Sequence, residues 1–369
     1  MKASCAVSID LSCVNLGGKT INIGLVGGKI ESMTPVNGPA NWVALPLPVD
    51  PHVHLDKTFT IDRCSVTKPG LFGAIEATQA DVENWTAADI RARAHRGLVE
   101  AYSNGLSALR THVDWTQSEM PLAWSVVSEL REDWADKMTV QQAVLAPLDL
   151  LSDPVVGPNI AQQVAAKGGI LGCFIYRNED LDAKVERVFG LAERYNLSLD
   201  FHVDEGLDAQ ACGFDAVVAL TAKYHMSGRV LCGHACSLSI RPKDDVARVI
   251  DAAAMAGVAL TVLPTTNLHL QDMEQGRSPR LRGLAPMQEL RRAGVKVVLG
   301  ADNVADPFYP RGCYAALAMG LSAPALTVGA RGDFMLLEGA HWDDALRDPR
   351  AKRHVIRSGQ NTSFTKDAV

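Results

Sequence analysis

The sequence lacks the long apolar runs, basic clusters and paired cysteines that identify several large classes of protein. No run of about 18 apolar residues is present, and the first residues contain no continuous apolar segment of the kind that directs secretion. There is no long run of Lys or Arg, and the formal net charge of −6 at pH 7 gives no general attraction to nucleic acid. We therefore expect a cytoplasmic protein that acts on a small molecule, with no membrane or nucleic-acid function. Its oligomeric state, a homo-oligomer included, is left open.

The eight cysteines are scattered along the chain, and no Cys-x-x-Cys pair occurs among them. This spacing favours reduced thiols over a disulfide scaffold and argues against a structural zinc ribbon. The same absence counts against the zinc deaminases that act on cytidine and nucleic acids, because their signature includes a Pro-Cys-x-x-Cys segment.

The chain does contain enough apolar material for one large core, with 47% hydrophobic residues in a length of 369. Residues 1–34 alternate short apolar segments with Gly17-Gly18 and Gly27-Gly28, a pattern typical of small antiparallel strands joined by tight turns. From Val49 onward, apolar runs alternate with amphipathic stretches. The expected strands are 47–54, 106–113, 138–146, 170–176, 197–203, 229–233, 258–263 and 295–299, and the expected helices include 87–104, 184–195, 244–256 and 285–293.

Eight strands that alternate with helices predict an α/β fold, a (β/α)8 TIM barrel whose strands are buried on both faces. Enzymes with this fold carry their chemistry at the carboxyl ends of the strands. Ionisable side chains follow five of the eight expected strands: His52 and His54, His112 and Asp114, His202 with Asp204 and Glu205, His234, and Asp302 beside Asn303. Residues two apart in a strand share a face, so the His-x-His pair is a candidate half of a metal site.

Five segments carry a resemblance to a known family. They are Asp-Pro-His-Val-His-Leu-Asp-Lys-Thr (50–58), Phe-His-Val-Asp-Glu (201–205), Gly-His-Ala (233–235), Asn-Leu-His-Leu-Gln (267–271) and Leu-Gly-Ala-Asp-Asn-Val-Ala-Asp-Pro-Phe-Tyr-Pro-Arg-Gly (299–312). Together they resemble the cytosine deaminase branch of the amidohydrolase superfamily. The resemblance implies a distorted TIM barrel of the metal-dependent hydrolase type, with one divalent ion, zinc or iron, that hydrolyses C–N bonds of nitrogen heterocycles.

The resemblance also implies roles for individual residues. The expected metal ligands are His52, His54, His202 and Asp302. Such a set leaves an open position for water, and the metal lowers the pKa of that water towards about 7. Asp302 can also accept the proton of the water, Glu205 is the expected proton shuttle to the substrate, and His234 is expected to lie beside the attacking hydroxide.

The expected substrate contacts differ from the pattern of that branch. They are Leu148, His112, His269, Asn303 and Phe308. Leu148 stands where the branch presents a Gln that pairs with the pyrimidine ring, and Asn303 and Phe308 stand where it often has Asp and Trp. The substrate is therefore expected to be another heterocycle, such as a pterin, a triazine, isoguanine or creatinine. His112 could instead make a structural hydrogen bond or bind metal, and His269 could stabilise a loop.

The region after the barrel resembles the return of the family to a small β-sandwich, beginning at Leu326. The expected domains are a discontinuous β-sandwich of residues 1–46 and 325–369, and a barrel of residues 47–324. Relatives usually carry some tens of residues of helix between Pro324 and Leu326. Whether that helical segment is deleted or lies outside this sequence is left open.

These observations lead to one functional prediction. We expect a mononuclear metal-dependent deaminase of a small nitrogen heterocycle, an enzyme that acts on C–N bonds other than peptide bonds and releases ammonia. Two alternatives are left open. One is a hydrolase of cyclic amides or N-alkylamines that uses the same site, and the other is a catalytically inactive binding relative.

Overall fold

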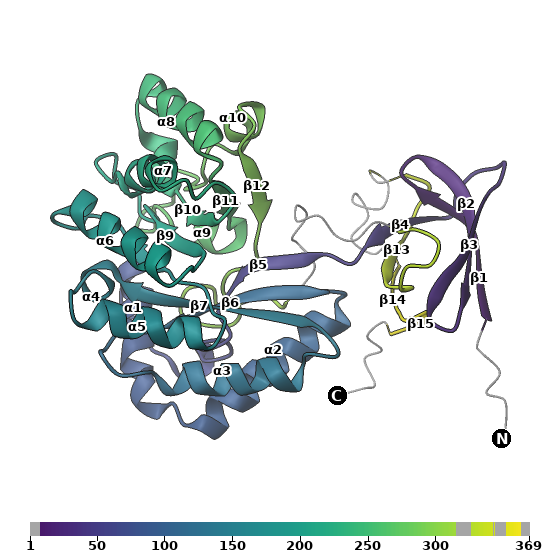
Figure 1. Cartoon of the computed structure of the whole chain (residues 1–369), viewed down its shortest axis with the longest axis horizontal. Helices are drawn as coiled ribbons and strands as arrows, with labels where there is room; N and C mark the ends of the chain where they lie inside the picture. Colours follow the sequence, from purple (N-terminus) through teal and green to yellow (C-terminus); the bar gives the residue numbers. More distant parts are fainter. Residues whose placement is uncertain (1–7, 315–325, 342, 344–351, 363–369) are drawn as a thin grey trace. The chain divides into compact units, whose positions relative to one another are not determined.

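The structure is a computed structural model of the 369-residue chain, and it describes residues 8–314, 326–341, 343 and 352–362. These residues form two compact units (Figure 1). One unit takes its described residues from 8–49, 100–107 and 326–362, and the other comprises 50–99 and 108–314. The predicted domain limit between residues 46 and 47 stays a prediction, and the limit between 324 and 325 lies outside the described residues.

The larger unit is a parallel β-barrel. Its strands are β5 (Val49–Val53), β6 (Ala108–Asp114), β7 (Thr139–Pro147), β8 (Cys173–Ile175), β9 (Leu199–Val203), β10 (Val230–His234), β11 (Ala259–Val262) and β12 (Lys296–Leu299). They are hydrogen-bonded in sequence order from β5 to β12, and the strands from β6 onward run parallel to their neighbours. Each strand falls within one of the eight apolar runs or overlaps it, so the predicted (β/α)8 barrel is confirmed.

The barrel closes between its first and last strands. The backbone N–H of Asp302, just after β12, donates to the carbonyl of His52 at 2.8 Å. The carboxyl group of Asp50 reinforces this closure, because it accepts the N–H of Ala301 at 3.2 Å and the N–H of His52 at 3.2 Å. Burial raises the pKa of Asp50 to about 7. Closure therefore brings the His-x-His motif of β5 next to the residues that follow β12.

Helices cover the outside of this barrel (Figure 1). They are α1 (Gly70–Asp81), α2 (Ala87–Ser103), α3 (Leu122–Asp133), α4 (Leu148–Leu151), α5 (Val156–Ala166), α6 (Leu181–Arg194), α7 (Gly213–Lys223), α8 (Lys243–Ala256), α9 (Pro264–Leu270) and α10 (Met287–Arg292), with 3₁₀ turns η1 (Ile61–Arg63), η2 (Val82–Asn84) and η3 (Cys236–Ile240). Helix α6 buries Val185, Val188 and Ala192, which recur on one face at helical spacing. The four predicted helices correspond to α2, α6, α8 and α10. None of the described helices combines the length and apolarity needed to cross a membrane.

The smaller unit is a seven-stranded sheet of N-terminal and C-terminal segments. Its strands are β1 (Ser8–Leu16), β2 (Lys19–Val26), β3 (Lys29–Pro35), β4 (Trp42–Pro46), β13 (Phe334–Glu338), β14 (Arg353–Arg357) and β15 (Gln360–Asn361), in the order β15-β14-β13-β4-β1-β2-β3. The glycine pairs at 17–18 and 27–28 have positive φ and form the predicted turns. The N–H of Ile30 donates to the carbonyl of Ala330 at 2.9 Å. This bond joins β3 to the segment that precedes β13. The strands of the sheet share one apolar core that includes Ile23, Phe334 and Ile356.

Asp204 provides a test of how the end of β9 is fixed. Its buried carboxyl group accepts the N–H groups of Gly213 and Phe214, each at 2.9 Å, at the start of α7. Asp204→Ala leaves both buried donors without this acceptor, so we expect the free energy of unfolding in urea to fall by about 1–3 kcal/mol. The exposed Asp62 of the same unit is the control, and Asp62→Ala should change the free energy of unfolding by less than about 0.5 kcal/mol. Equal effects of the two substitutions would contradict this account.

Candidate active site

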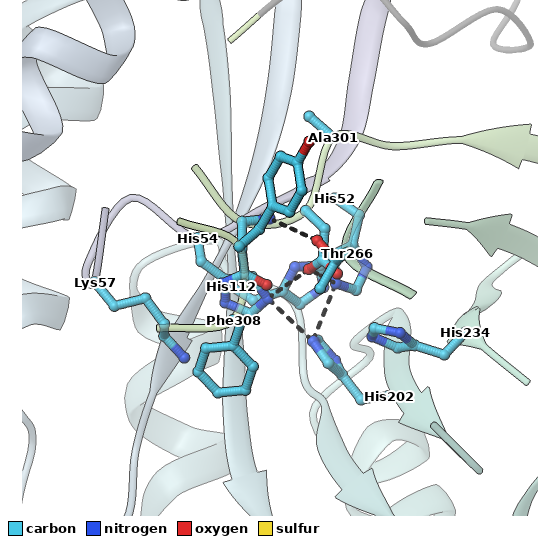
Figure 2. Close-up of polar contacts among 12 residues, drawn as sticks. His52, His54, Lys57, His112, His202, His234, Thr266, Ala301 and Phe308 are labelled. Carbon is cyan, nitrogen blue, oxygen red and sulfur yellow. Dashed lines mark hydrogen bonds and ion pairs between the residues drawn. The ribbon is translucent and has the colours of Figure 1, made fainter. Parts of the chain in front are cut away.

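Four side chains converge at the carboxyl end of the barrel. The Nε2 atoms of His52 and His202 are 3.0 Å apart, and Nε2 of His202 is 3.3 Å from Nε2 of His54. Oδ1 of Asp302 lies 3.4 Å from Nε2 of His52 and 3.2 Å from Nε2 of His54. Figure 2 shows the three labelled rings turned toward this common point. We call His52, His54, His202 and Asp302 the four-residue cluster.

The spacing and the unmet polar groups of the cluster fit a divalent metal ion. Ligand atoms about 2.0–2.2 Å from a tetrahedral zinc ion lie about 3.3–3.6 Å from one another. Four of the six separations, those of His52 and His54 from His202 and from Asp302, are 3.0 to 3.4 Å and close to this range. Neither carboxylate oxygen of Asp302 receives a well-directed hydrogen bond from any described residue. Because a buried carboxylate without donors is unfavourable, a cation at this point would satisfy it.

The protonation states of the cluster also suit a metal. Burial, together with the positive charge of Lys57, holds the pKa of His54 well below its usual range. Burial and the neighbouring histidines do the same for His202. Burial raises the pKa of Asp302, but its contacts with His52 and His54 outweigh this and leave that pKa well below its usual range. Neutral imidazoles and an ionised carboxylate are the forms that coordinate metals.

Glu205 and His234 lie beside the cluster, at the ends of β9 and β10. Oε1 of Glu205 is 3.6 Å from Nδ1 of His234, and both side chains are buried. Burial and the charge of Asp302 hold the pKa of Glu205 well above its usual range, which favours the protonated form of this carboxyl group. Burial lowers the pKa of His234 to about 3, so its ring is neutral. The amide of Asn267 lies 3.0 Å from Nδ1 and donates to it, which leaves the ring proton on Nε2.

His112 lies against the cluster. Its ring centroid is 4.0 Å from that of His52, and its Nε2 is 3.2 Å from Oδ1 of Asp200. Burial lowers the pKa of His112 to about 4. Two sets of described residues have all their ligand atoms within 4.8 Å of one another: the four histidines 52, 54, 112 and 202, and His52 with His234 and Asp302. His112 can thus support the cluster through Asp200 or supply a ligand, and both alternatives from the sequence stay open.

The backbone at three strand ends adopts a conformation that non-glycine residues rarely take. Asp204, His234 and Asp302 have φ values of 47°, 71° and 66°. Such left-handed conformations are unfavourable by about 1–3 kcal/mol each and persist only where the surrounding structure enforces them. They occur here at or next to the residues that surround the cluster, which favours a functional explanation.

A cavity of about 760 Å³ opens over the cluster. His54, His202, His234, Glu205 and Asp302 contribute to its lining. Its other walls are largely apolar and include Leu71, Ile75, Trp85, Leu122, Phe174 and Phe308. The volume is in the range of about 300–1,000 Å³ that is typical of small-molecule sites.

The structure brings only part of the predicted substrate-binding set to this cavity. Asn303 and Phe308 line it. Leu148 is fully buried at the start of α4 and is not among the lining residues, whereas the preceding Pro147 is. His269 is half-buried and packs edge-on against Tyr309, with ring centroids 5.7 Å apart, outside the lining. Substrate contacts of Leu148 and His269 stay predictions without support from the cavity.

Sequence reasoning missed Lys57 as a cavity residue. Its side chain is only 3% exposed, and its Nζ lies 2.7 Å from the carboxylate of Asp114. Both residues line the cavity. The available signal was the position of Lys57 directly after the His-x-His motif, at the carboxyl end of β5.

Comparison with known proteins identifies the family. The model of the amidohydrolase family matches residues 67–319. A pterin deaminase of Rhizobium rhizogenes is 33% identical over 342 residues, which cover 84% of this chain and 78% of that protein. These matches confirm the predicted enzyme class, a hydrolase that acts on C–N bonds.

Two solved structures share the fold. A 5-methylcytosine deaminase from Klebsiella pneumoniae superposes with a TM-score of 0.82 at 21% identity and covers 98% of this chain and 99% of its own. An N-isopropylammelide isopropylaminohydrolase from Burkholderia multivorans has a TM-score of 0.75 at 22% identity, covering 97% of this chain and all of its own. Since the family model spans more than half of the sequence and the Rhizobium relative resembles most of it, the chain belongs to the amidohydrolase family.

Proposed function

We propose that this protein is a metal-dependent hydrolytic deaminase of an amino-substituted nitrogen heterocycle of the pterin type. The observation that carries the proposal is the cluster of three imidazoles and one carboxylate beside the buried Glu205, in one cavity of about 760 Å³. The pterin deaminase of Rhizobium rhizogenes, at 33% identity, supports the substrate class.

His52, His54, His202 and Asp302 would hold one divalent ion, zinc or iron. When bound, that ion supplies a nucleophile at neutral pH, because it lowers the pKa of a coordinated water to about 7. Asp302 is ionised, because its pKa lies well below the usual range, and its oxygens have no other donor among the described residues, so one of them could accept a proton from the attacking water.

Glu205 and His234 would act on the substrate. The raised pKa of Glu205 favours its protonated form, which can donate a proton to a ring nitrogen next to the carbon that bears the amino group and so make that carbon more electrophilic. The Glu205 carboxylate that results could take the proton of the new hydroxyl group as the carbonyl forms, while the proton held by Asp302 moves to the amino group, which leaves as ammonia. His234 presents Nε2–H, which has no partner among the described residues, and can donate to the oxygen that gains negative charge.

The cavity supports a substrate larger than a single pyrimidine. Its 760 Å³ leave space for a fused two-ring system, and the flat faces of Phe174 and Phe308 can pack against such rings. The polar groups of the cluster would orient the ring edge that reacts, while much of the rest of the molecule contacts apolar walls.

The direct test is turnover of 2-amino-4-oxopteridine by protein reconstituted with zinc or iron(II). We expect one ammonia per pteridine and a product in which the amino group is replaced by oxygen, measured by an ammonia assay and mass spectrometry. Cytosine, isoguanine, creatinine and an aminotriazine complete the panel. If metal-loaded protein releases ammonia from none of these compounds, the deaminase proposal is wrong. Hydrolysis of cyclic amides or N-alkylamines, or binding alone, would then have to be tested.

Metal binding can be tested at His202. His202→Ala removes one of the three imidazoles, and we expect the affinity for zinc to fall by more than about 100-fold, because even the outer partners of metal ligands contribute about 10–100-fold. Elemental analysis after dialysis against a weak chelator measures the retained metal. His269→Ala is the matched control, since this histidine lies outside the cavity lining. Equal metal retention by both variants would exclude the proposed ligand set.

The proton-transfer role can be tested at Glu205. Glu205→Gln keeps the shape of the side chain but has no acidic proton, so we expect kcat to fall by about 10²–10⁴-fold with metal content unchanged. Glu83→Gln is the control, because Glu83 lines the same cavity but is exposed. A Glu205→Gln variant with a kcat within about threefold of the unchanged protein would argue against the role.

A further inference from the structure

Lys57 and Asp114 form an ion pair in the cavity that the proposed reaction does not use. Nζ of Lys57 is 2.7 Å from each of the two carboxylate oxygens of Asp114. The Lys57 side chain is 3% exposed, and that of Asp114 is 28% exposed. The ammonium also lies 5.3 Å from the ring centroid of Phe308, which lines the same cavity (Figure 2).

The ammonium of Lys57 has more N–H donors than the carboxylate of Asp114 can use. An ammonium has three N–H donors, and Asp114 is the sole hydrogen-bond acceptor of Nζ among the described residues. Two carboxylate oxygens can occupy two of these donors at most, so at least one N–H has no protein partner. Because Lys57 lines the cavity, this N–H is available to a molecule bound there.

The two residues are held in place from behind by Asp56. Oδ1 of Asp56 accepts the backbone N–H of Lys57, and Oδ2 accepts the backbone N–H of Asp114, each at 2.9 Å. Arg93 donates to the carbonyls of Asp56 at 2.8 Å and Thr58 at 2.9 Å. The ends of β5 and β6 are thereby joined, so the ammonium and the carboxylate form a fixed pair of donor and acceptor.

The charges around Lys57 disfavour an anionic ligand. Burial lowers the pKa of Lys57, but the carboxyl groups of Asp114, Asp56 and Asp306 outweigh this and raise it above its ordinary value. A carboxylate or phosphate on the substrate would therefore approach one ammonium among three carboxyl groups. A neutral group that both accepts and donates a hydrogen bond matches the pair better.

The pair lies across the mouth of the barrel from the proposed proton donor. Lys57 and Asp114 follow the first and second strands, β5 and β6, while Glu205 follows the fifth, β9, and all three line one cavity. A flat ring with its reacting carbon over the cluster can thus offer one ring nitrogen to Glu205 and its opposite edge to the pair.

We propose that Lys57 and Asp114 select substrates with a lactam edge, a ring N–H next to a ring carbonyl. Nζ of Lys57 donates to the carbonyl oxygen, and the carboxylate of Asp114 accepts the ring N–H. This inference rests on the proposed function and specifies its substrate: the amino-bearing carbon lies next to the lactam N–H, as in 2-amino-4-oxopteridine. Lys57 and Asp114 are then specificity-determining residues.

The experiment compares 2-amino-4-oxopteridine with 2-amino-4-methoxypteridine, which has neither the carbonyl nor the ring N–H. The preference is kcat/KM for the oxo compound divided by kcat/KM for the methoxy compound. We expect this ratio to be about 10–100-fold larger for the unchanged protein than for Lys57→Met, since hydrogen bonds to charged groups contribute about that factor. The loss in Lys57→Met should appear mainly in KM for the oxo compound. Turnover of the methoxy compound by the variant should fall by a smaller factor than turnover of the oxo compound.

A binding measurement keeps the inference separate from the proposed function. Fluorescence titration with 4-oxopteridine and 4-methoxypteridine, which have no amino group to lose, gives the same preference as a ratio of Kd values. If the unchanged protein releases no ammonia, the proposed function is wrong. The ratio of the two Kd values still decides whether Lys57 and Asp114 bind a lactam edge in preference to a methoxy-substituted one.

Further variants guard against a structural explanation. Lys57→Met/Asp114→Leu removes both charges, so that no carboxylate is left unpaired in the cavity, and it should lose the same preference. Lys68→Met is the control, because its ion pair with Glu76 is exposed on both sides. A preference that is unchanged in both Lys57 variants, or equal losses for the oxo and methoxy compounds, would overturn the inference.

Discussion

The whole site depends on four buried side chains whose neighbouring ligand atoms lie 3.0 to 3.4 Å apart, with few partners other than one another. The barrel creates this constraint when it closes, because the hydrogen bond from the N–H of Asp302 to the carbonyl of His52 joins the last strand to the first. At this junction between the last and first strands, Asp302 also has a left-handed backbone conformation, with a φ of 66°. A buried carboxylate that faces imidazoles without directed donors is unfavourable by itself, so a bound cation would stabilise the arrangement that folding imposes.

This constraint also separates the two carboxyl groups of the site. Asp302 contacts two imidazoles and has its pKa held well below the usual range, whereas the imidazole next to Glu205 is that of His234, 3.6 Å from its Oε1. Burial and the negative charge of Asp302 hold the pKa of Glu205 well above its usual range. The pKa values of two carboxyl groups in one cavity are thus shifted in opposite directions, an arrangement that suits one to accept a proton and the other to donate one. Their chemical difference arises from position within the barrel and not from residue type.

Much of the fold and of the cluster could be predicted from the sequence, because strand periodicity and strand-end position are local properties. The eight apolar runs correspond to β5 through β12, and the strand-end histidines lie together as barrel geometry requires. What the sequence does not indicate depends on contacts between distant segments. The pairing of Lys57 with Asp114 requires β5 and β6 to be neighbours and Asp56 to join them. Leu148 turns into α4 one residue after Pro147, and no periodic pattern indicates on which side of the cavity wall a single residue lies.

A planar heterocycle can rotate within its own plane, and apolar walls fix the plane without fixing that rotation. Only one rotation brings the amino-bearing carbon over the cluster and a ring nitrogen to Glu205. Because the cavity is larger than one ring, contact with Glu205 alone would leave other rotations accessible. A second directional anchor on the far side of the barrel mouth removes them, and it must have both a donor and an acceptor to distinguish the two directions along the ring edge. A cation and a carboxylate from adjacent strands, held at fixed spacing by the carboxyl group behind them, meet that requirement.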